Sequence, residues 1–261
     1  MTGRTASGGS TPVDGAPGSV DKTAGEVTRR GGLGIPVRLD HTNRVQVRNL
    51  FRRVVEEHGQ LDVFVSAVWG GNERLLDPFW QRPFWDQPVD VWQEYMEAGP
   101  HAFWLSAHAA AGVMAERRTG LIVAISEPVL EGAYEGQFPD MAEMFSRLGH
   151  SAINGLVRGL SIDAEKAGIA VIGLLPGFMK TERVEMHLQS LGEEARRQFR
   201  YDLAETPEYA GRAVVALAGD SHAITRTGQL VYVADLAEAY GFNDADGIRV
   251  GNYYRLLGLI P

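Results

Sequence analysis

The 261-residue chain contains no cysteine, which excludes disulfide bonds, thiolate nucleophiles and cysteine-ligated metal sites. No apolar run approaches the roughly 20 residues that a membrane-spanning helix requires. The opening stretch, MTGRTASGGS, lacks the apolar core of a secretory signal peptide. We therefore expect a soluble, cytoplasmic protein that does not associate with membranes.

Positive charge is also scarce. The chain has 25 lysine and arginine residues against 33 aspartate and glutamate residues, which gives a formal net charge of −8. Such a surface repels polyanions, so we expect no nucleic-acid partner. Small neutral or organic molecules are the ligand class that this charge balance favours.

Hydrophobic residues make up 44% of the chain, which is enough for one large core, and no internal repeat is visible. We therefore predict a single domain over residues 1–261. Residues 5–19, TASGGSTPVDGAPGS, are rich in glycine, serine and proline and have no apolar period. This composition predicts a flexible loop or arm.

Apolar runs and amphipathic stretches alternate along the rest of the chain, which predicts strands and helices in turn. We expect strands at 35–40, 61–68, 121–126, 169–175 and 229–234. We expect helices at 20–32, 45–59, 89–115, 141–167, 191–203 and 207–218. The strands are apolar throughout, which is typical of a parallel sheet covered by helices on both faces. Ligands of such sheets bind beyond the carboxyl ends of the strands.

Several fragments carry a resemblance to a known family. They are TGR at 2–4, GIPVRLDHT at 34–42, LDVFVSAVWGG at 61–71, LIVAISEP at 121–128, GHSAINGL at 149–156 and LLPGFMKTE at 174–182. In order and spacing the chain resembles the short-chain dehydrogenase/reductase family. The resemblance implies an α/β fold, a Rossmann-like doubly wound parallel sheet, here lacking the first βα unit and its glycine-rich loop.

That loop holds the dinucleotide pyrophosphate in the family, and the chain has no substitute for it. Arg4 and Asp40 resemble the residues that hold an adenosine 2′-phosphate and the adenine ring. Without the loop we expect these two side chains alone not to anchor NADP. We therefore expect no cofactor, and nothing in the sequence indicates a metal.

The resemblance also implies that the catalytic positions have changed. The family uses a Tyr-x-x-x-Lys pair with a serine and an asparagine. Ser146 and His150 stand at the tyrosine and lysine positions, Glu127 at the serine and Glu97 at the asparagine. These four residues are the catalytic candidates, and reductase chemistry is not expected of them.

Two carboxylates, an imidazole and a hydroxyl can remove and donate protons near neutral pH. A carboxylate beside His150 is expected to raise the pKa of the imidazole and to fix its tautomer. General acid–base catalysis of this kind contributes roughly 10²–10⁴ in rate. We therefore hypothesise a cofactor-independent, non-redox cyclase, isomerase or lyase that acts on a polyketide-like natural-product intermediate. Each residue also has a structural alternative, such as an ion pair for Glu97 and a small packing residue for Ser146.

Aromatic side chains predict an apolar wall for this pocket and hence a small hydrophobic organic substrate. The candidate substrate-binding residues are Trp69, Trp80, Trp85, Tyr134, Phe138, Phe178 and Met179.

Two other hypotheses stay open. The chain could be a catalytically inactive pseudoenzyme that acts as a binding or scaffold protein, or an NADPH-dependent reductase whose start was set too late. The family associates through its two long helices, which implies a homodimer or homotetramer built on 89–115 and 141–167.

Overall fold

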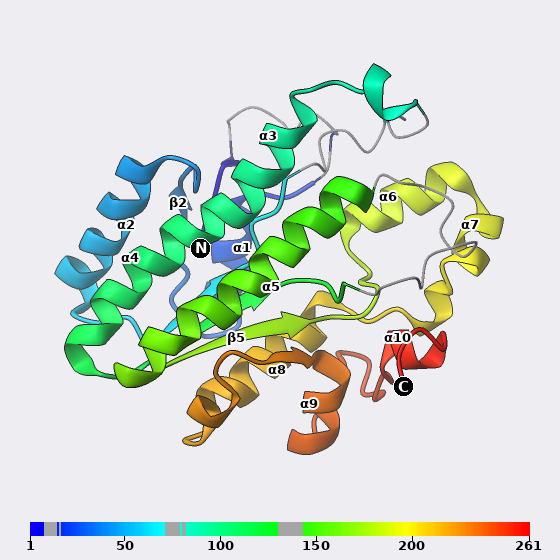
Figure 1. Cartoon of the computed structure of the whole chain (residues 1–261). Coiled ribbons are helices and arrows are strands. Elements are labelled where there is room, and N and C mark those ends of the chain that lie inside the picture. The colour runs from blue at the N-terminus through cyan, green and yellow to red at the C-terminus, as the bar shows by residue number, and fades with distance from the viewer. Residues whose placement is uncertain (8–14, 16, 71–78, 80–81, 130–142) are drawn as a thin grey trace.

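The computed structural model describes residues 1–7, 15, 17–70, 79, 82–129 and 143–261 (Figure 1). The strands are β1 (Thr2–Gly3), β2 (Val37–Arg38), β3 (Val63–Ser66), β4 (Gly120–Ile125), β5 (Ile169–Leu175) and β6 (Leu230–Tyr232). The helices are α1 (Val20–Arg29), α2 (Arg44–His58), α3 (Val91–Met96), α4 (Ala102–Arg117), α5 (Glu143–Lys166), α6 (Glu182–Leu191), α7 (Glu193–Gln198), α8 (Pro207–Gly219), α9 (Val233–Tyr240) and α10 (Tyr253–Leu256).

All strand pairings in the described residues are parallel. β3, β4, β5 and β6 form one sheet in that order, and β1 pairs with β2 in a separate two-stranded sheet. The buried side chain of His41 joins the small sheet to the rest of the fold. Its Nε2 atom lies 2.9 Å from Thr2 Oγ1 on β1, and its Nδ1 atom lies 2.9 Å from Ser106 Oγ on α4.

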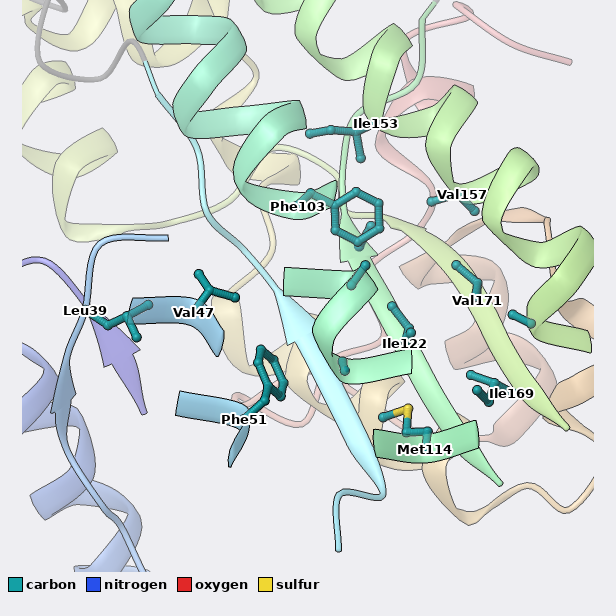
Figure 2. Close-up of a cluster of buried hydrophobic side chains, with 14 residues drawn as sticks. Leu39, Val47, Phe51, Phe103, Met114, Ile122, Ile153, Val157, Ile169 and Val171 are labelled. Atoms are coloured by element: carbon teal, nitrogen blue, oxygen red, sulfur yellow. The ribbon is translucent and has the colours of Figure 1, made fainter. Parts of the chain in front are cut away.

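Alternate residues of the central strands face opposite layers of helices. Ile122 and Val171 pack with α2, α4 and α5 on one face, where Figure 2 shows them beside Phe103 and Val157. Their neighbours Val123, Ile172 and Leu174 pack on the other face, against α8 and α9. Figure 1 shows α4 and α5 lying across one side of β5 with α8 and α9 on the other. The predicted α/β fold with a parallel sheet is confirmed.

Local sequence explains where helices begin and end. α2 begins after Asn43, whose side chain accepts hydrogen bonds from Val45 N and Gln46 N, and it ends at Gly59 in the left-handed region. The predicted helix 89–115 is interrupted by a π-helical segment at Glu97–His101 that contains Pro100. Because proline lacks an N–H and crowds the preceding turn, the wider π turn accommodates it.

Three expectations about the elements were wrong. The stretch 182–190 is helical in α6, and the predicted strand 229–234 gives way to α9 at Val233. Val65 in β3 is 41% exposed although this strand was expected to be buried on both faces. Among the described residues β3 pairs with β4 alone, so it lies at the edge of the four-stranded sheet, where fewer side chains cover it.

The predicted arm at 5–19 lies mostly outside the described residues. No helix in the described parts of the chain combines the length and apolarity needed to cross a bilayer.

Candidate active site

Four side chains meet where the carboxyl ends of β3 and β4 approach α5. Trp69 follows β3, Ser126 and Glu127 follow β4 directly, and His150 lies on α5. We call these four residues the carboxyl-edge site. This is the edge at which parallel α/β sheets bind ligands.

His150 is the central group of the site and is buried, with 7% of its surface exposed. Its Nδ1 atom lies 3.1 Å from Ser126 Oγ, and its Nε2 atom lies 3.8 Å from Glu127 Oε2. The first distance is a hydrogen bond, whereas the second is an ion-pair distance too long for one. The structure therefore brings Glu127 and His150 together as the sequence predicted, and it adds Ser126.

Sequence reasoning missed Ser126, although a signal was present. Ile122 and Ala124 point from β4 toward the α5 layer, and the two-residue period of a strand puts Ser126 on the same side. The backbone of Glu127 is held against α5, because Asn154 on that helix donates a hydrogen bond to its carbonyl oxygen at 3.0 Å.

The expected effect of the carboxylate on His150 was wrong. Burial lowers the pKa of the imidazole to about 4. The free-energy cost of burying a charged imidazolium is larger than the gain from its attraction to the Glu127 carboxylate, because that carboxylate is largely solvated. His150 is therefore neutral at pH 7, with one ring nitrogen as donor and the other as acceptor.

Glu127 is the open member of the site. The surrounding protein desolvates its carboxyl group and raises its pKa. Its side chain nevertheless remains 60% exposed, so solvent screens much of that effect. The carboxyl group is thus accessible to a substrate and binds a proton more readily than a fully solvated glutamate.

Trp69 covers His150. The indole and imidazole rings stack with centroids 3.9 Å apart and planes 14° apart. Two glycines make room for the indole. A Cβ atom on Gly149 would lie 2.7 Å from Trp69 Cη2, and one on Gly99 would lie 3.0 Å from Trp69 Cζ3. Trp69 also meets Tyr95 edge to face, with ring centroids 5.9 Å apart. The predicted wall residue therefore packs directly on the predicted catalytic histidine.

The other two catalytic candidates stand apart from this cluster. Ser146 lies on α5 one turn before His150 and is partly buried. Glu97 lies in the π-helical segment with an exposed side chain. Within the described residues no hydrogen bond or ion pair joins either side chain to His150 or Glu127. Their catalytic roles stay predictions.

The predicted wall residues fall into three groups. Phe178 and Met179 follow β5 on the same edge of the sheet, and the Phe178 ring stacks on Phe199 with centroids 5.7 Å apart. Trp85 is 72% exposed and pairs edge to face with Phe84. The remaining predicted wall residues lie outside the described residues: Trp80, Tyr134 and Phe138.

Comparison with known proteins places this geometry in a family. A sequence-family model described as Enoyl-(Acyl carrier protein) reductase matches residues 13–235. Human Dehydrogenase/reductase SDR family member 1 is 30% identical over 243 residues, which cover 91% of this chain and 75% of the human protein. The chain belongs to the short-chain dehydrogenase/reductase family. The mouse member is 29% identical over 240 residues, which cover 90% of this chain and 74% of the mouse protein.

Solved structures have the same fold as this family member. A Xanthomonas campestris protein assigned as a dehydrogenase superposes with a TM-score of 0.72 at 20% identity, covering 96% of this chain and 83% of that one. The NADPH-dependent reductase YwfH superposes with a TM-score of 0.67 at 15% identity, covering 88% of this chain and 84% of YwfH.

These findings overturn the hypothesis of a cofactor-independent, non-redox cyclase, isomerase or lyase. The matching family model describes a reductase, and the curated relatives are dehydrogenase/reductase proteins. Changed residues at the catalytic positions do not by themselves change the class of reaction. The alternative hypothesis of an NADPH-dependent reductase agrees better with the relatives.

Proposed function

We propose that the protein is an NADPH-dependent oxidoreductase that reduces the carbonyl group of a hydrophobic organic compound at the carboxyl-edge site. The observation that carries the proposal is the family match, which spans residues 13–235 and so includes the whole carboxyl-edge site. The 30% identity to the human dehydrogenase/reductase supports the same reaction class.

Charged side chains at one corner of the fold fit the adenosine end of NADPH. Arg4 follows β1 and Arg38 ends β2, and Arg38 Nε donates a hydrogen bond to the Arg4 carbonyl oxygen at 3.2 Å. Both arginine residues are exposed. This contact brings the Arg38 side chain to the backbone of Arg4. Guanidinium groups are well suited to bind a phosphate group. Arg4 and Arg38 would therefore hold the 2′-phosphate of the cofactor.

Asp40 lies beside this pair and supplies a fixed negative charge. Burial acts to raise the pKa of its carboxyl group, but hydrogen bonds from Thr42 and the charge of Arg4 lower it overall. Thr42 donates to Asp40 Oδ1 through both its backbone N–H, at 2.9 Å, and its hydroxyl, at 2.8 Å. An ionised carboxylate held in this way can accept hydrogen bonds from adenosine.

NADPH, when bound, supplies the hydride for carbonyl reduction. The chain itself must supply a proton to the product oxygen, and Glu127 is suited to hold that proton. Its carboxyl group is exposed at the ligand edge of the sheet, and its pKa is raised. A proton donor in this position contributes roughly 10²–10⁴ in rate.

His150 supports Glu127 in this proposal without itself carrying a charge. A neutral imidazole can accept a proton at one nitrogen and release one at the other, so it can connect Ser126 to Glu127. Trp69 shields one face of the imidazole from water. Ser126, which is 2% exposed, orients the ring and does not contact substrate.

An assay of turnover tests the proposal. Purified protein is mixed with NADPH or NADH and a panel of hydrophobic aldehydes and ketones, and consumption of the reduced cofactor is followed with the alcohol product. We expect reduction of at least one panel member with a preference for NADPH over NADH. Absence of product across the panel, in protein that binds NADPH, would contradict the carbonyl-reductase assignment.

The assembly and location are parts of the same proposal. We propose a homodimer or homotetramer formed through α4 and α5, which carry the exposed apolar residues Trp104 and Ile162. Light scattering on Ile162→Glu protein should then show smaller particles than the wild type. We also propose a cytoplasmic location, because the chain has no cysteine to form the disulfide bonds that are typical of exported proteins.

A further inference from the structure

A buried carboxyl group that neither the sequence prediction nor the proposed reaction uses lies under the segment that follows β5. Glu205 comes between this segment and α8, and 1% of its surface is exposed. The backbone of Glu205 makes two hydrogen bonds to this segment. Glu205 N donates to the Phe178 carbonyl oxygen at 2.9 Å, and Lys180 N donates to the Glu205 carbonyl oxygen at 2.7 Å. The stretch 181–204 contains α6 and α7, and its two ends meet at Glu205. We call it the loop 181–204.

The carboxyl group of Glu205 packs against the backbone of Gly177. The Gly177 N–H donates a hydrogen bond to it. A Cβ atom on Gly177 would lie 3.1 Å from Glu205 Oε2 and 2.8 Å from Tyr253 Cβ, so the close packing requires a glycine. The second oxygen, Oε1, is buried and has no hydrogen-bond partner among the described residues.

The titratable groups that face Glu205 do not neutralise it. They are Asp244 after α9, Tyr209 on α8 and, across Gly177, Tyr253 on α10. Asp244 is also buried and accepts hydrogen bonds from the backbone N–H and the hydroxyl of Thr206. The positive charge of Arg249 acts on Tyr209, where it acts to lower the pKa of the hydroxyl group.

Burial therefore raises the pKa of the Glu205 carboxyl to about 8, opposed by the Gly177 N–H and reinforced by the negative charge of Asp244. At neutral pH the group is mostly protonated, and its neutral form matches the packing. An unfolded or opened segment would return this carboxyl to water, where it ionises near its ordinary value of about 4.3.

We propose that Glu205 is a proton-dependent latch: its neutral carboxyl group holds the loop 181–204 and the adjoining Phe178–Met179 wall in place, and loss of the proton releases them. The wall consists of side chains that were predicted to bind substrate, and Phe178 is packed among Phe199, Tyr201 and Tyr253. Glu205 is thus a positioning residue. The inference does not depend on the reaction assigned to the site.

The direction of the pH effect follows from linkage. The closed loop retains the Glu205 proton up to pH of about 8, whereas the open loop loses it above about 4.5. Opening therefore becomes about tenfold more favourable for each pH unit between these limits and levels off above pH 8. Lower pH tightens the latch.

Hydrogen exchange of the free full-length protein tests the latch. Backbone amide protection in 181–204 is measured by mass spectrometry between pH 5 and pH 8, after correction for the intrinsic exchange rate. We expect protection to fall by about tenfold per pH unit in the wild type. The Glu205→Gln variant, which is neutral and nearly isosteric, should keep its protection within about twofold across the range.

Controls separate the latch from other causes. Glu193→Gln removes an exposed carboxylate from the same loop and should behave as the wild type does. Exchange in the presence of low urea concentrations distinguishes local opening, which responds weakly, from global unfolding, which responds strongly. Equal pH dependence in the wild type and Glu205→Gln, or protection in the wild type that does not change with pH, would overturn the proposal.

Discussion

The molecule holds two acidic clusters whose burial has opposite consequences. At the carboxyl-edge site, Glu127 is 60% exposed and lies 3.8 Å from His150. Below the segment after β5, both Glu205 and Asp244 are 1% exposed. In the first cluster the buried group is the His150 imidazole, and burial lowers its pKa. In the second cluster the buried group is the Glu205 carboxyl, and burial raises its pKa.

Access to the carboxyl group separates the two clusters. Glu127 is exposed enough to exchange a proton with a substrate, whereas Glu205 is enclosed by protein and cannot contact one, so its protonation responds to pH alone. Glu127 and Glu205 have the same side chain, and their surroundings assign them different roles.

Substituting the open carboxyl group should have the largest effect. Glu127→Gln removes the proposed proton donor, so kcat for carbonyl reduction should fall by roughly 10²–10⁴. The dissociation constant for NADPH should stay unchanged because Arg4 and Arg38 are intact. Steady-state kinetics and calorimetry measure the two quantities. The control is Glu238→Gln, which changes an exposed carboxylate on α9 and should alter kcat by less than about threefold. Equal losses in both variants would place the proton donor elsewhere.

Substituting the closed carboxyl group should change the pH dependence of stability. The folded-state pKa of Glu205 is raised to about 8, so its stabilising effect is complete below about pH 4.5 and is lost as the pH rises to 8. The free energy of unfolding should therefore fall by up to about 1.4 kcal/mol per pH unit through this group. In Glu205→Gln that contribution vanishes. Urea unfolding at several pH values measures the slope, and parallel curves for the two proteins would refute the assignment.

His150 should change the pH dependence of stability in the direction opposite to that of Glu205, so that stability is lost as the pH falls. Its folded-state pKa is lowered from 6.5 to about 4, so its stabilising effect is complete above pH 6.5 and is lost as the pH falls to 4. The loss should reach about 3 kcal/mol. His150→Asn should lack this acid-side decline. His58→Asn, which changes an exposed histidine on α2, should retain it. The same urea titrations extended to acid pH provide the measurement.

The packing under Trp69 offers a smaller test. Gly149→Ala places a methyl group 2.7 Å from the indole, which forces a shift of Trp69 away from His150. Gly155→Ala on the same helix meets nothing within 4 Å and should gain helix propensity instead. The first variant should be less stable than the second by about 1–3 kcal/mol in thermal or urea unfolding. Equal stabilities would mean that Trp69 is not held against α5.

The arginine pair should show the smallest effect. Arg38→Ala removes one of two cations near the proposed 2′-phosphate, so the dissociation constant for NADPH should rise by about tenfold, as for loss of one charged hydrogen bond. The constant for NADH, which lacks that phosphate, should change by less than about twofold. Calorimetric titration with both cofactors measures the ratio. A similar change in the dissociation constants for NADPH and NADH would show that the 2′-phosphate does not bind at Arg38.

The sequence predicted most of the fold because its strands and helices follow simple periods. β4 and β5 appeared as apolar runs, and α1, α2 and α8 had clear ends. The π-helical segment at Pro100 and the short α9 depend on local adjustments that periodicity does not describe. The exposure of Val65 depends on which strand pairs with β3, and that is a property of the tertiary structure.

The candidate site was predicted in part. Spacing and resemblance predicted that Glu127 and His150 lie together. They did not predict that Trp69 stacks on His150 or that Ser126 and His150 share a hydrogen bond. The direction of the His150 pKa shift was missed because burial depends on packing around α5. Glu205 carried no signal at all in the sequence, since only the approach of Gly177 makes its carboxyl group unusual.

Calorimetric titration of the purified protein with NADPH shows whether this short-chain dehydrogenase/reductase uses that cofactor. We expect saturable binding with a dissociation constant below about 100 μM, and weaker binding of NADH. Absence of binding for both cofactors up to about 1 mM, in protein whose circular dichroism shows a folded α/β chain, would contradict it.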